Sequence, residues 1–216
     1  MCGARAGSLT DESGRPSPLA HRREAHCPGA AVTVREHRQR TVQPASHAAP
    51  AEPGQACRWI TESERRGVRA SSRLLEVAQV EPPADVAAAM KLSKGDVCLM
   101  RSQILLFDEE PVELVKSYHP LDLARGTAMM ERRKVRGGTP RLLADMGHPP
   151  RRCVDHVSAR VPTQEQYAAL RMPSDLPVLR TLRVVYGDGE RPIEVTVTAK
   201  AGHLYELRYD FSEGDG

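Results

Sequence analysis

Two charged side chains in strand-like runs, Arg101 and Glu194, are of residue types that can contact a small molecule. An anion that leaves water needs charge-assisted donors, and the planar fork of arginine matches a carboxylate or a phosphate. A glutamate can accept hydrogen bonds from a hydroxyl or an amine, or act as a general acid. Each residue also fits a structural role, Arg101 on a solvent-facing strand surface and Glu194 as a cross-strand partner. The residues alone leave both roles open.

Other kinds of chemistry lack the residues they need. His148, Cys153 and His156 lie close in sequence, but the strand period of two puts Cys153 and His156 on opposite faces, and no fourth metal ligand is near. Asp188 and Glu190 are turn residues. The chain has no nucleophile elbow, no P-loop and no dinucleotide-binding fingerprint. We therefore expect no catalytic residue, no metal and no cofactor.

The elements that would position Arg101 and Glu194 are short strands joined mostly by tight turns. Strands are predicted over 72–80, 97–107, 112–119, 151–161, 177–186 and 193–200, with a terminal piece over 204–211. Helices are predicted over 84–91, 121–130 and 140–146, and another opens at 162–166. The acidic turn at 108–111 and Gly187–Gly189 each predict a hairpin. Six strands with about four short helices indicate an α+β fold built on a mostly antiparallel sheet.

Several details of these elements can be checked against a structure. Thr139 is expected to cap the helix over 140–146, and Gly147 to end it. Tyr167 and Leu170 are expected to face inward from the helix that follows Pro162. The charged segment 59–69 is interpreted as a linker. Cys98 and Cys153 fall inside strand patterns, where a cysteine is a small core residue.

The composition divides the chain into two parts. All eight aromatic residues lie at or after Trp59, and residues 1–57 are rich in Ala, Arg, Pro, Gly, Ser and His. Such a segment cannot bury enough apolar surface to offset its chain entropy. We expect a disordered tail or linker over 1–58 and a folded domain over 59–213. The arginines of the tail are diluted by carboxylates and the net charge is only +3, so a DNA-binding arm is not predicted.

Cysteine usage and hydropathy bear on where the protein works. The five cysteines are scattered, odd in number and without metal-ligand spacing, which is typical of reduced thiols. No apolar run approaches the ~20 residues of a membrane span, and the first residues lack the apolar core of a signal peptide. We expect a cytoplasmic protein with no membrane contact.

Two hairpins with helices between them resemble the UTRA (UbiC transcription regulator-associated) domain, the effector-binding domain of HutC-type GntR transcription regulators. Short patches carry the resemblance, and they match in order and spacing: residues 138–148, 158–163, 177–180, 192–195 and 205–211. The resemblance implies the fold of chorismate lyase, in which a six-stranded antiparallel sheet and its helices enclose a ligand pocket. It also implies a homodimer that senses a small molecule and does no chemistry.

The resemblance further implies a set of effector-binding residues. In relatives that bind sugar phosphates or carboxylates, a serine near the first strand and an arginine on the second hold the anion, and these map onto Ser71 or Ser72 and Arg101. The full set of candidates is Ser71, Ser72, Arg101, Ser117, Glu194, Lys200, His203 and Tyr205. Ile104 and Val115 stand where relatives often have a second arginine and an acid. A small anionic effector is therefore expected, less polar than a sugar phosphate, unless the site is degenerate.

The chain departs from the family at its start. Family members carry an N-terminal winged helix-turn-helix that contacts DNA, whereas residues 1–57 lack the required helical periodicity. We expect a sensor domain that does not bind DNA on its own. Two alternatives remain: an enzyme of the chorismate-lyase fold acting on a small carboxylate, for which Arg101 and Glu194 are the only plausible pair, and a non-functional remnant of a regulator gene.

Overall fold

The computed structural model describes residues 40–42, 50–173 and 176–207. The disorder expected for most of the first 58 residues falls on 1–39 and 43–49, which lie outside the described residues. The end of the strand predicted over 204–211 lies outside them too.

A six-stranded sheet is the centre of the fold, with strand order β2-β3-β4-β7-β6-β5 and every neighbouring pair antiparallel. The strands are β2 (Ala70–Val80), β3 (Cys98–Phe107), β4 (Glu110–Pro120), β5 (Arg152–Arg160), β6 (Val178–Tyr186) and β7 (Pro192–Ala201). The structure confirms the predicted α+β fold and the six strands on which it is built, each to within two residues of its predicted ends.

Two tight connections build this sheet from hairpins. Between β3 and β4, Asp108 and Glu109 have φ values of 49° and 68°, the left-handed pair that a two-residue hairpin turn of the mirror-image type requires. Between β6 and β7, a short 3-10 turn, η3 (Asp188–Glu190), contains Gly189 at φ 66°. The hairpins place β4 beside β7 at the centre of the sheet.

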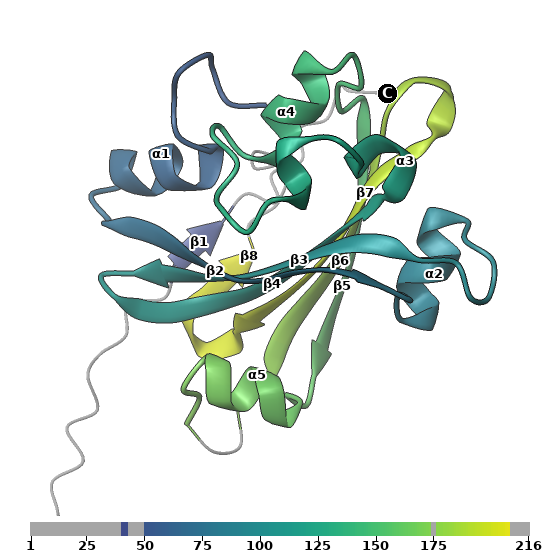
Figure 1. The fold of residues 1–216 in the computed structure, drawn as a ribbon. Helices are drawn as coiled ribbons and strands as arrows, with labels where there is room; N and C mark the ends of the chain where they lie inside the picture. The colour runs from purple at the N-terminus through teal and green to yellow at the C-terminus, as the bar shows by residue number, and fades with distance from the viewer. Residues whose placement is uncertain (1–39, 43–49, 174–175, 208–216) are drawn as a thin grey trace, which may run out of the picture. The chain divides into compact units, whose positions relative to one another are not determined.

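Helices cover both faces of the sheet. On one face, Val86 and Met90 of α2 (Ala84–Met90) pack against Met100, Tyr118 and Leu182. Leu170, which ends α5 (Gln164–Ala169), packs on the same face. The opposite face lies under α1 (Arg58–Arg65), α3 (Leu121–Ala124), the 3-10 helix η2 (Ala128–Met130) and α4 (Thr139–Asp145), and Figure 1 shows α1, α3 and α4 together on that side.

Two apolar clusters lie on the face below α1 and α4. One joins Leu99 to Met129 and Leu143, all at most 1% exposed. The other gathers Leu105 and Phe107, and the indole of Trp59 in α1 stacks on Phe107 with ring centroids 4.9 Å apart. Since Leu99 and Leu105 are six residues apart on β3, the strand between them can carry polar residues that face the same side.

The structure corrects four local expectations. The helix predicted over 121–130 is broken at Gly126 (φ 73°) into α3 and η2. Thr139 is the first residue of α4 rather than its cap, which is Gly138. Tyr167 is 43% exposed and does not face inward, although Leu170 does. The segment interpreted as a linker forms α1, because Trp59 anchors it to Phe107.

A second, two-stranded sheet lies outside the main one. Its strands are β1 (Arg40–Val42), from the segment predicted as tail, and β8 (Tyr205–Leu207), which follows the short 3-10 helix η4 (Gly202–Leu204), and they run parallel. In the part of the chain that the structure describes, no helix is both long and apolar enough to cross a membrane.

Candidate functional site

A cavity of about 530 Å³ opens on the sheet face between the two apolar clusters. The sheet forms its floor, and its walls come from two covering segments, 54–60 leading into α1 and 134–140 leading into α4. Its volume falls in the range of small-molecule sites, roughly 300–1,000 Å³. The strand registers place the floor residues in three parallel rows across the sheet, which we name after one residue of each row.

The Arg101 row lies nearest to Met129. Its members are register partners on successive strands of the sheet from β3 to β5: Arg101, Ser117, Thr196, Arg183 and Asp155. The two arginines therefore stand on either side of a pair of hydroxyl groups, whose oxygens are 3.0 Å apart. This row holds the most polar groups of the floor.

The middle row is uncharged. Its members span all six strands: Leu74, Gln103, Val115, Thr198, Thr181 and Val157. Leu74, Val115 and Val157 present only aliphatic carbon, whereas Gln103 offers an amide and Thr198 and Thr181 offer hydroxyl groups. The centre of the cavity floor is therefore neutral and of mixed polarity.

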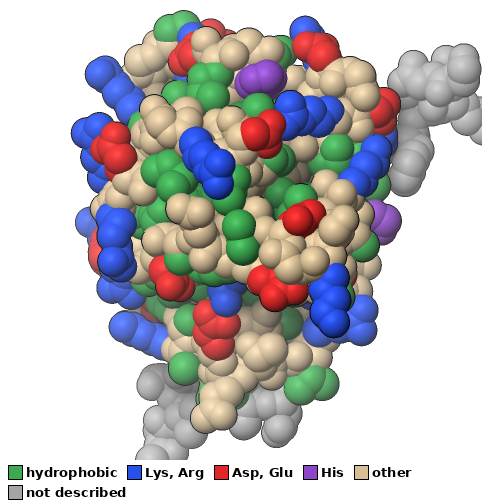
Figure 2. Space-filling model, turned by 45° about the vertical axis from the view of Figure 1, so that its right-hand side comes forward, with side chains coloured by type: hydrophobic (Ala, Val, Ile, Leu, Met, Phe, Trp, Pro, Cys, Tyr) green, Lys and Arg blue, Asp and Glu red, His purple; other side chains and the backbone are tan. Residues whose placement is uncertain are grey.

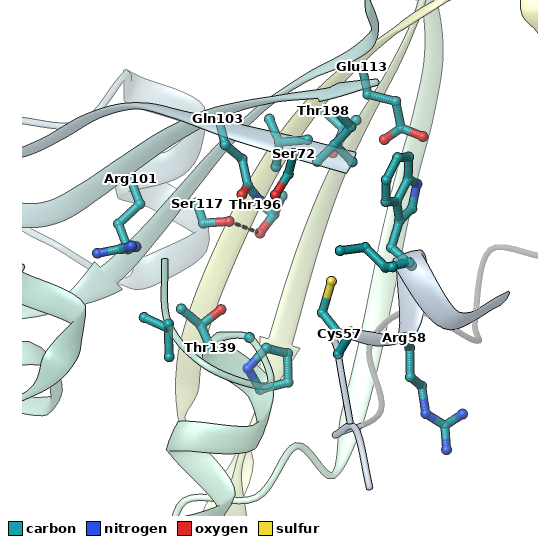
Figure 3. Close-up of a pocket in the computed structure, with 18 of the residues that line it drawn as sticks. Cys57, Arg58, Ser72, Arg101, Gln103, Glu113, Ser117, Thr139, Thr196 and Thr198 are labelled. Atoms are coloured by element: carbon teal, nitrogen blue, oxygen red, sulfur yellow. Dashed lines mark hydrogen bonds between the residues drawn. The ribbon is translucent and has the colours of Figure 1, made fainter. Parts of the chain in front are cut away.

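The Lys200 row lies nearest to α1. It comprises Ser72, Leu105, Glu113 and Lys200 on four successive strands. Lys200 Nζ lies 2.9 Å from Glu113 Oε2, and the side chains are 13% and 6% exposed, so this ion pair is closed and buried. Figure 3 shows Glu113, Cys57 and Arg58 on the side of the pocket away from Arg101.

Arg101 is a buried cation held by main-chain oxygens. It is 7% exposed, and its Nη1 donates to the carbonyls of Met129 and Glu131, while Nη2 donates to that of Arg133 at 2.6 Å. Burial lowers the pKa of the guanidinium from its ordinary value. Within the described part of the chain it has no carboxylate partner. A buried charge without a counter-ion is costly, so an anion in the cavity would stabilise it.

Arg183 is paired differently. Its Nε and Nη2 each lie 2.7 Å from one carboxylate oxygen of Asp155, which is a bidentate pair with both side chains less than a fifth exposed. Burial lowers the pKa of Arg183, but the hydrogen bonds and charge of Asp155 outweigh it, so the pKa is raised. The charge of Arg183 is thus matched within the protein.

Glu194 lies on β7 two residues before Thr196, which is one row beyond the Arg101 row, and it does not line the cavity. It is 8% exposed, and its two oxygens accept hydrogen bonds from Thr196 at 2.7 Å and Thr139 at 3.3 Å. Both threonines do line the cavity. Glu194 therefore orients wall hydroxyls and ties the start of α4 to β7, instead of facing a bound molecule.

The other residues predicted to bind the effector divide into those that line the cavity and those that do not. Ser72, Arg101, Ser117 and Lys200 line the cavity, although they come from four different strands. Ser71 points to the other face of β2, and His203 in η4 is away from the cavity. Tyr205 is buried beside Lys200, whose Nζ lies 5.4 Å from its ring centroid. Their roles as effector contacts remain predictions.

Several lining residues were missed from the sequence, notably Trp59, Glu113, Thr139, Asp155 and Arg183. Glu113 could have been found, since it shares its strand parity with Ser117. The pairing of Asp155 with Arg183 could not, because α5 separates their strands and leaves the register undetermined. Thr139 was assigned to capping, which hid its contact with Glu194.

The charge of the lining is strongly positive. Six cationic side chains border the cavity, Arg58, Arg101, Lys134, Arg136, Arg183 and Lys200, against two carboxylates, Glu113 and Asp155. Lys134 and Arg136 are exposed on the wall segment, where they can attract an anion before it is desolvated.

A six-stranded sheet with a covered cavity on one face belongs to the class of folds that can hold a small molecule. The sequence profile of the UTRA domain matches residues 65–206, which is more than half of the chain. The chain therefore belongs to the UTRA domain family and is a ligand-binding regulatory domain of the kind found in transcription regulators.

Known proteins similar to this chain are transcription regulators. An uncharacterized HTH-type transcriptional regulator of Streptomyces coelicolor is 27% identical over 156 residues, 69% of this chain and 57% of that relative. The chain thus spans less than two thirds of that relative's length.

Solved structures show the same fold. A GntR-family transcriptional regulator matches with a TM-score of 0.68 and 19% identity, covering 81% of this chain and 70% of the other. The effector domain of PhnF from Mycobacterium smegmatis matches with a TM-score of 0.63 and 18% identity, covering 76% and 98%. The ligand-binding domain of a GntR-family regulator from Bordetella bronchiseptica has a TM-score of 0.59 and 23% identity, covering 76% and 95%.

Proposed function

We propose that this chain is the sensor of a GntR-type transcription regulator of the HutC subfamily and that it binds a small anionic effector in the cavity above the Arg101 row. The observation that carries the proposal is the bonding of Arg101. This buried guanidinium on the cavity floor donates to carbonyl oxygens and to no described carboxylate. Arginine offers five donors. Three hydrogen bonds go to carbonyls, and Nε has no partner among the described residues, so the fork retains donors for an anion.

The neighbours of Arg101 support an anion at this position. Ser117 and Thr196 lie beside it in the same row, although the Thr196 hydroxyl donates to Glu194 and that of Ser117 bonds to Thr196, so a hydroxyl must rotate to donate to an anion. Ser72 is two rows away and can serve only a distant part of the effector. The excess of cationic side chains around the opening favours entry of a negatively charged molecule.

The proposal includes a homodimer in the cytoplasm. A sensor transmits binding when the effector has different affinities for two arrangements of the assembly, and two subunits supply such arrangements. DNA contact then belongs to a winged helix-turn-helix elsewhere in the full regulator. Figure 2 shows basic and acidic side chains interspersed on the face it draws, so that face offers no continuous basic surface to DNA.

The alternative of an enzyme with the chorismate-lyase fold is less well supported. Such an enzyme needs a general acid that faces the substrate, and the predicted candidate, Glu194, lies behind the wall with both oxygens hydrogen-bonded to threonines. The two carboxylates in the lining are engaged in ion pairs. Turnover of chorismate to 4-hydroxybenzoate by purified protein would support the enzyme hypothesis instead.

The proposal is tested by screening the purified chain for thermal stabilisation with carboxylates and phosphorylated metabolites, followed by calorimetry. Arg101→Gln should weaken binding of any anion that stabilises the wild type by roughly 10- to 100-fold, the worth of a hydrogen bond to a charged group. Arg73→Gln is the matched control, because Arg73 is exposed on β2 and does not line the cavity. Equal losses in both variants, or saturable binding only of uncharged compounds, would overturn the proposal.

A further inference from the structure

The three rows differ in the charge they offer to a bound molecule. In the Lys200 row, the ammonium of Lys200 is matched by Glu113 at 2.9 Å, and in the Arg101 row the guanidinium of Arg183 is matched by both oxygens of Asp155. Arg101 is the cation of the floor that has no carboxylate partner among the described residues. The floor therefore has a place for one anionic group, at one end.

Away from Arg101, the cavity is bordered mainly by carbon. The middle row contributes Leu74, Val115 and Val157, and the Lys200 row contributes Leu105. The covering segments add Trp59, Ile60, Val135 and Pro140. Alternate residues of a strand are about 7 Å apart, so this apolar stretch reaches about 14 Å from the Arg101 row to the Lys200 row.

Resting on the proposed function, we propose that the effector is an amphipathic monoanion. Its single acidic head group lies at the Arg101 row, and its apolar body extends over the middle row towards Trp59. Gln103 and Ser72 can match one or two neutral polar atoms along the body. Alkyl and aryl carboxylates have this chemistry, whereas the second charge of a dicarboxylate or a sugar phosphate would find no unmatched cation on the floor and would have to bind Arg58, Lys134 or Arg136 of the walls.

The hydroxyl groups of the site argue against a sugar. Ser117, Thr196 and Thr139 are already linked through Glu194 and to each other. A sugar ring over the middle row could find partners at Gln103, Thr181 and Thr198, but the hydroxyl groups that it places against Leu74 and Val115 would have none. A buried hydroxyl without a hydrogen bond is unfavourable, so polyols should bind less well than apolar bodies of the same size.

Trp59 makes the proposal measurable. It is the only tryptophan in the chain, it stacks on Phe107, and it lines the cavity at the end away from Arg101. An apolar body that reaches this end must change the emission of Trp59, while an anion confined to Arg101 leaves it unchanged. Fluorescence and calorimetry together therefore report the two ends separately.

The experiment titrates the full chain with propionate, butyrate, hexanoate and octanoate, and with inorganic phosphate and glucose 6-phosphate for comparison. Affinity should rise roughly fourfold per added methylene until the middle row is covered, as expected for burial of one CH₂ group. The longer acids should shift the emission of Trp59. Octanol, which lacks the charge, should bind at least tenfold more weakly than octanoate.

A pair of variants locates the apolar body. Leu74→Gln places an amide in the middle row and should lower octanoate affinity several-fold without changing that of propionate. Leu75→Gln is the matched control, since Leu75 is 42% exposed and does not line the cavity. Equal effects of the two variants would overturn the proposal.

The possible failures are distinguishable. Tighter binding of glucose 6-phosphate or phosphate than of octanoate, lost in Arg101→Gln, would overturn the amphipathic effector and leave the anion sensor intact. Affinity that does not depend on chain length would do the same. Absence of binding by every anion in the series would contradict both proposals.

Discussion

Arg101 and Arg133 are joined by a 2.6 Å hydrogen bond from the guanidinium Nη2 of the first to the main-chain carbonyl of the second. With the bonds to Met129 and Glu131, it ties the strand that forms the floor of the cavity to the segment that leads into its wall. The side chain proposed to bind the effector is thus also the side chain that holds part of the cover.

We expect Arg101→Gln to loosen the covering segment as well as to weaken binding. Three carbonyl oxygens lose charged donors, so the free energy of unfolding should fall by about 2 kcal/mol or more. Amide hydrogen exchange over residues 129–138 should become faster, while exchange in β6 and β7 changes much less. Arg73→Gln should leave both measurements unchanged. Unaltered exchange over 129–138 would show that the segment is held by other contacts.

Loss of the buried ion pair between Lys200 and Glu113 should lower the free energy of unfolding far more than loss of a surface pair. Lys200→Met removes the cation 2.9 Å from Glu113 and should destabilise the fold by about 3–5 kcal/mol in urea unfolding. The double variant Glu113→Leu, Lys200→Met should recover much of that loss, because no buried charge is left. Lys116→Met breaks a pair of similar length, 2.8 Å, with the exposed Glu165 and should cost about 1 kcal/mol or less. Similar losses for Lys116 and Lys200 would contradict the burial argument.

Stability should depend on the protonation of His119, which is fully buried in β4. Burial lowers its pKa, against the opposing effects of Glu194 and the main chain of Ile193, and Arg101 lowers it further. The unfolded chain takes up a proton near pH 6.5 while the folded chain does not, so stability falls as pH drops below that value.

His119 adds at most about 1.4 kcal/mol per pH unit to the slope of the unfolding free energy against pH. Urea unfolding at pH 7.5, 6.5 and 5.5 should show this slope in the wild type and a shallower one in His119→Leu. His156→Gln, on an exposed position of β5, should keep the wild-type slope. Identical slopes in wild type and His119→Leu would assign the acid sensitivity to other groups.

Thiol labelling should rank the described cysteines by their surroundings. Burial raises the pKa of Cys98 to about 11, and its side chain is inaccessible, so iodoacetamide at pH 8 should leave it unmodified in the folded protein. Cys57 lines the cavity and should react, more slowly when an effector is bound. Labelling in urea provides the control, since Cys98 must then react. Modification of Cys98 at the rate of Cys57 under native conditions would show that the core opens.

The strands were readable from the sequence, because alternation and turn residues are local, whereas the face on which Arg101 lies was left open. Ser72 and Arg101 were correctly placed on neighbouring strands with the help of a resemblance to a known family, but the register sets them two rows apart. The helix over 121–130 was predicted as continuous because Gly126 is only a modest penalty inside a helix, whereas here it takes a left-handed conformation.

The site depends on long-range register, which local patterns do not contain. The Arg101 row joins residues as far apart as 101 and 196 through two strand pairings. The contacts of Arg101 with carbonyls near 130 arise from an irregular segment with no repeating pattern. A sequence shows which side chains are available, and only the folded sheet shows which of them already have partners.

The irregular pairing at Leu75 affects how the sequence of β2 is aligned with the sequences of relatives. The pairing of β2 with β3 shifts between Leu74 and Glu76, so β2 carries one extra residue. Before the shift Ser72 and Leu74 share the cavity face, and after it Val77, paired with Arg101, shares that face as well. The two halves of β2 are therefore out of phase by one position. A relative without the extra residue needs a one-residue gap here, and an ungapped alignment would exchange inward and outward positions along half of the strand.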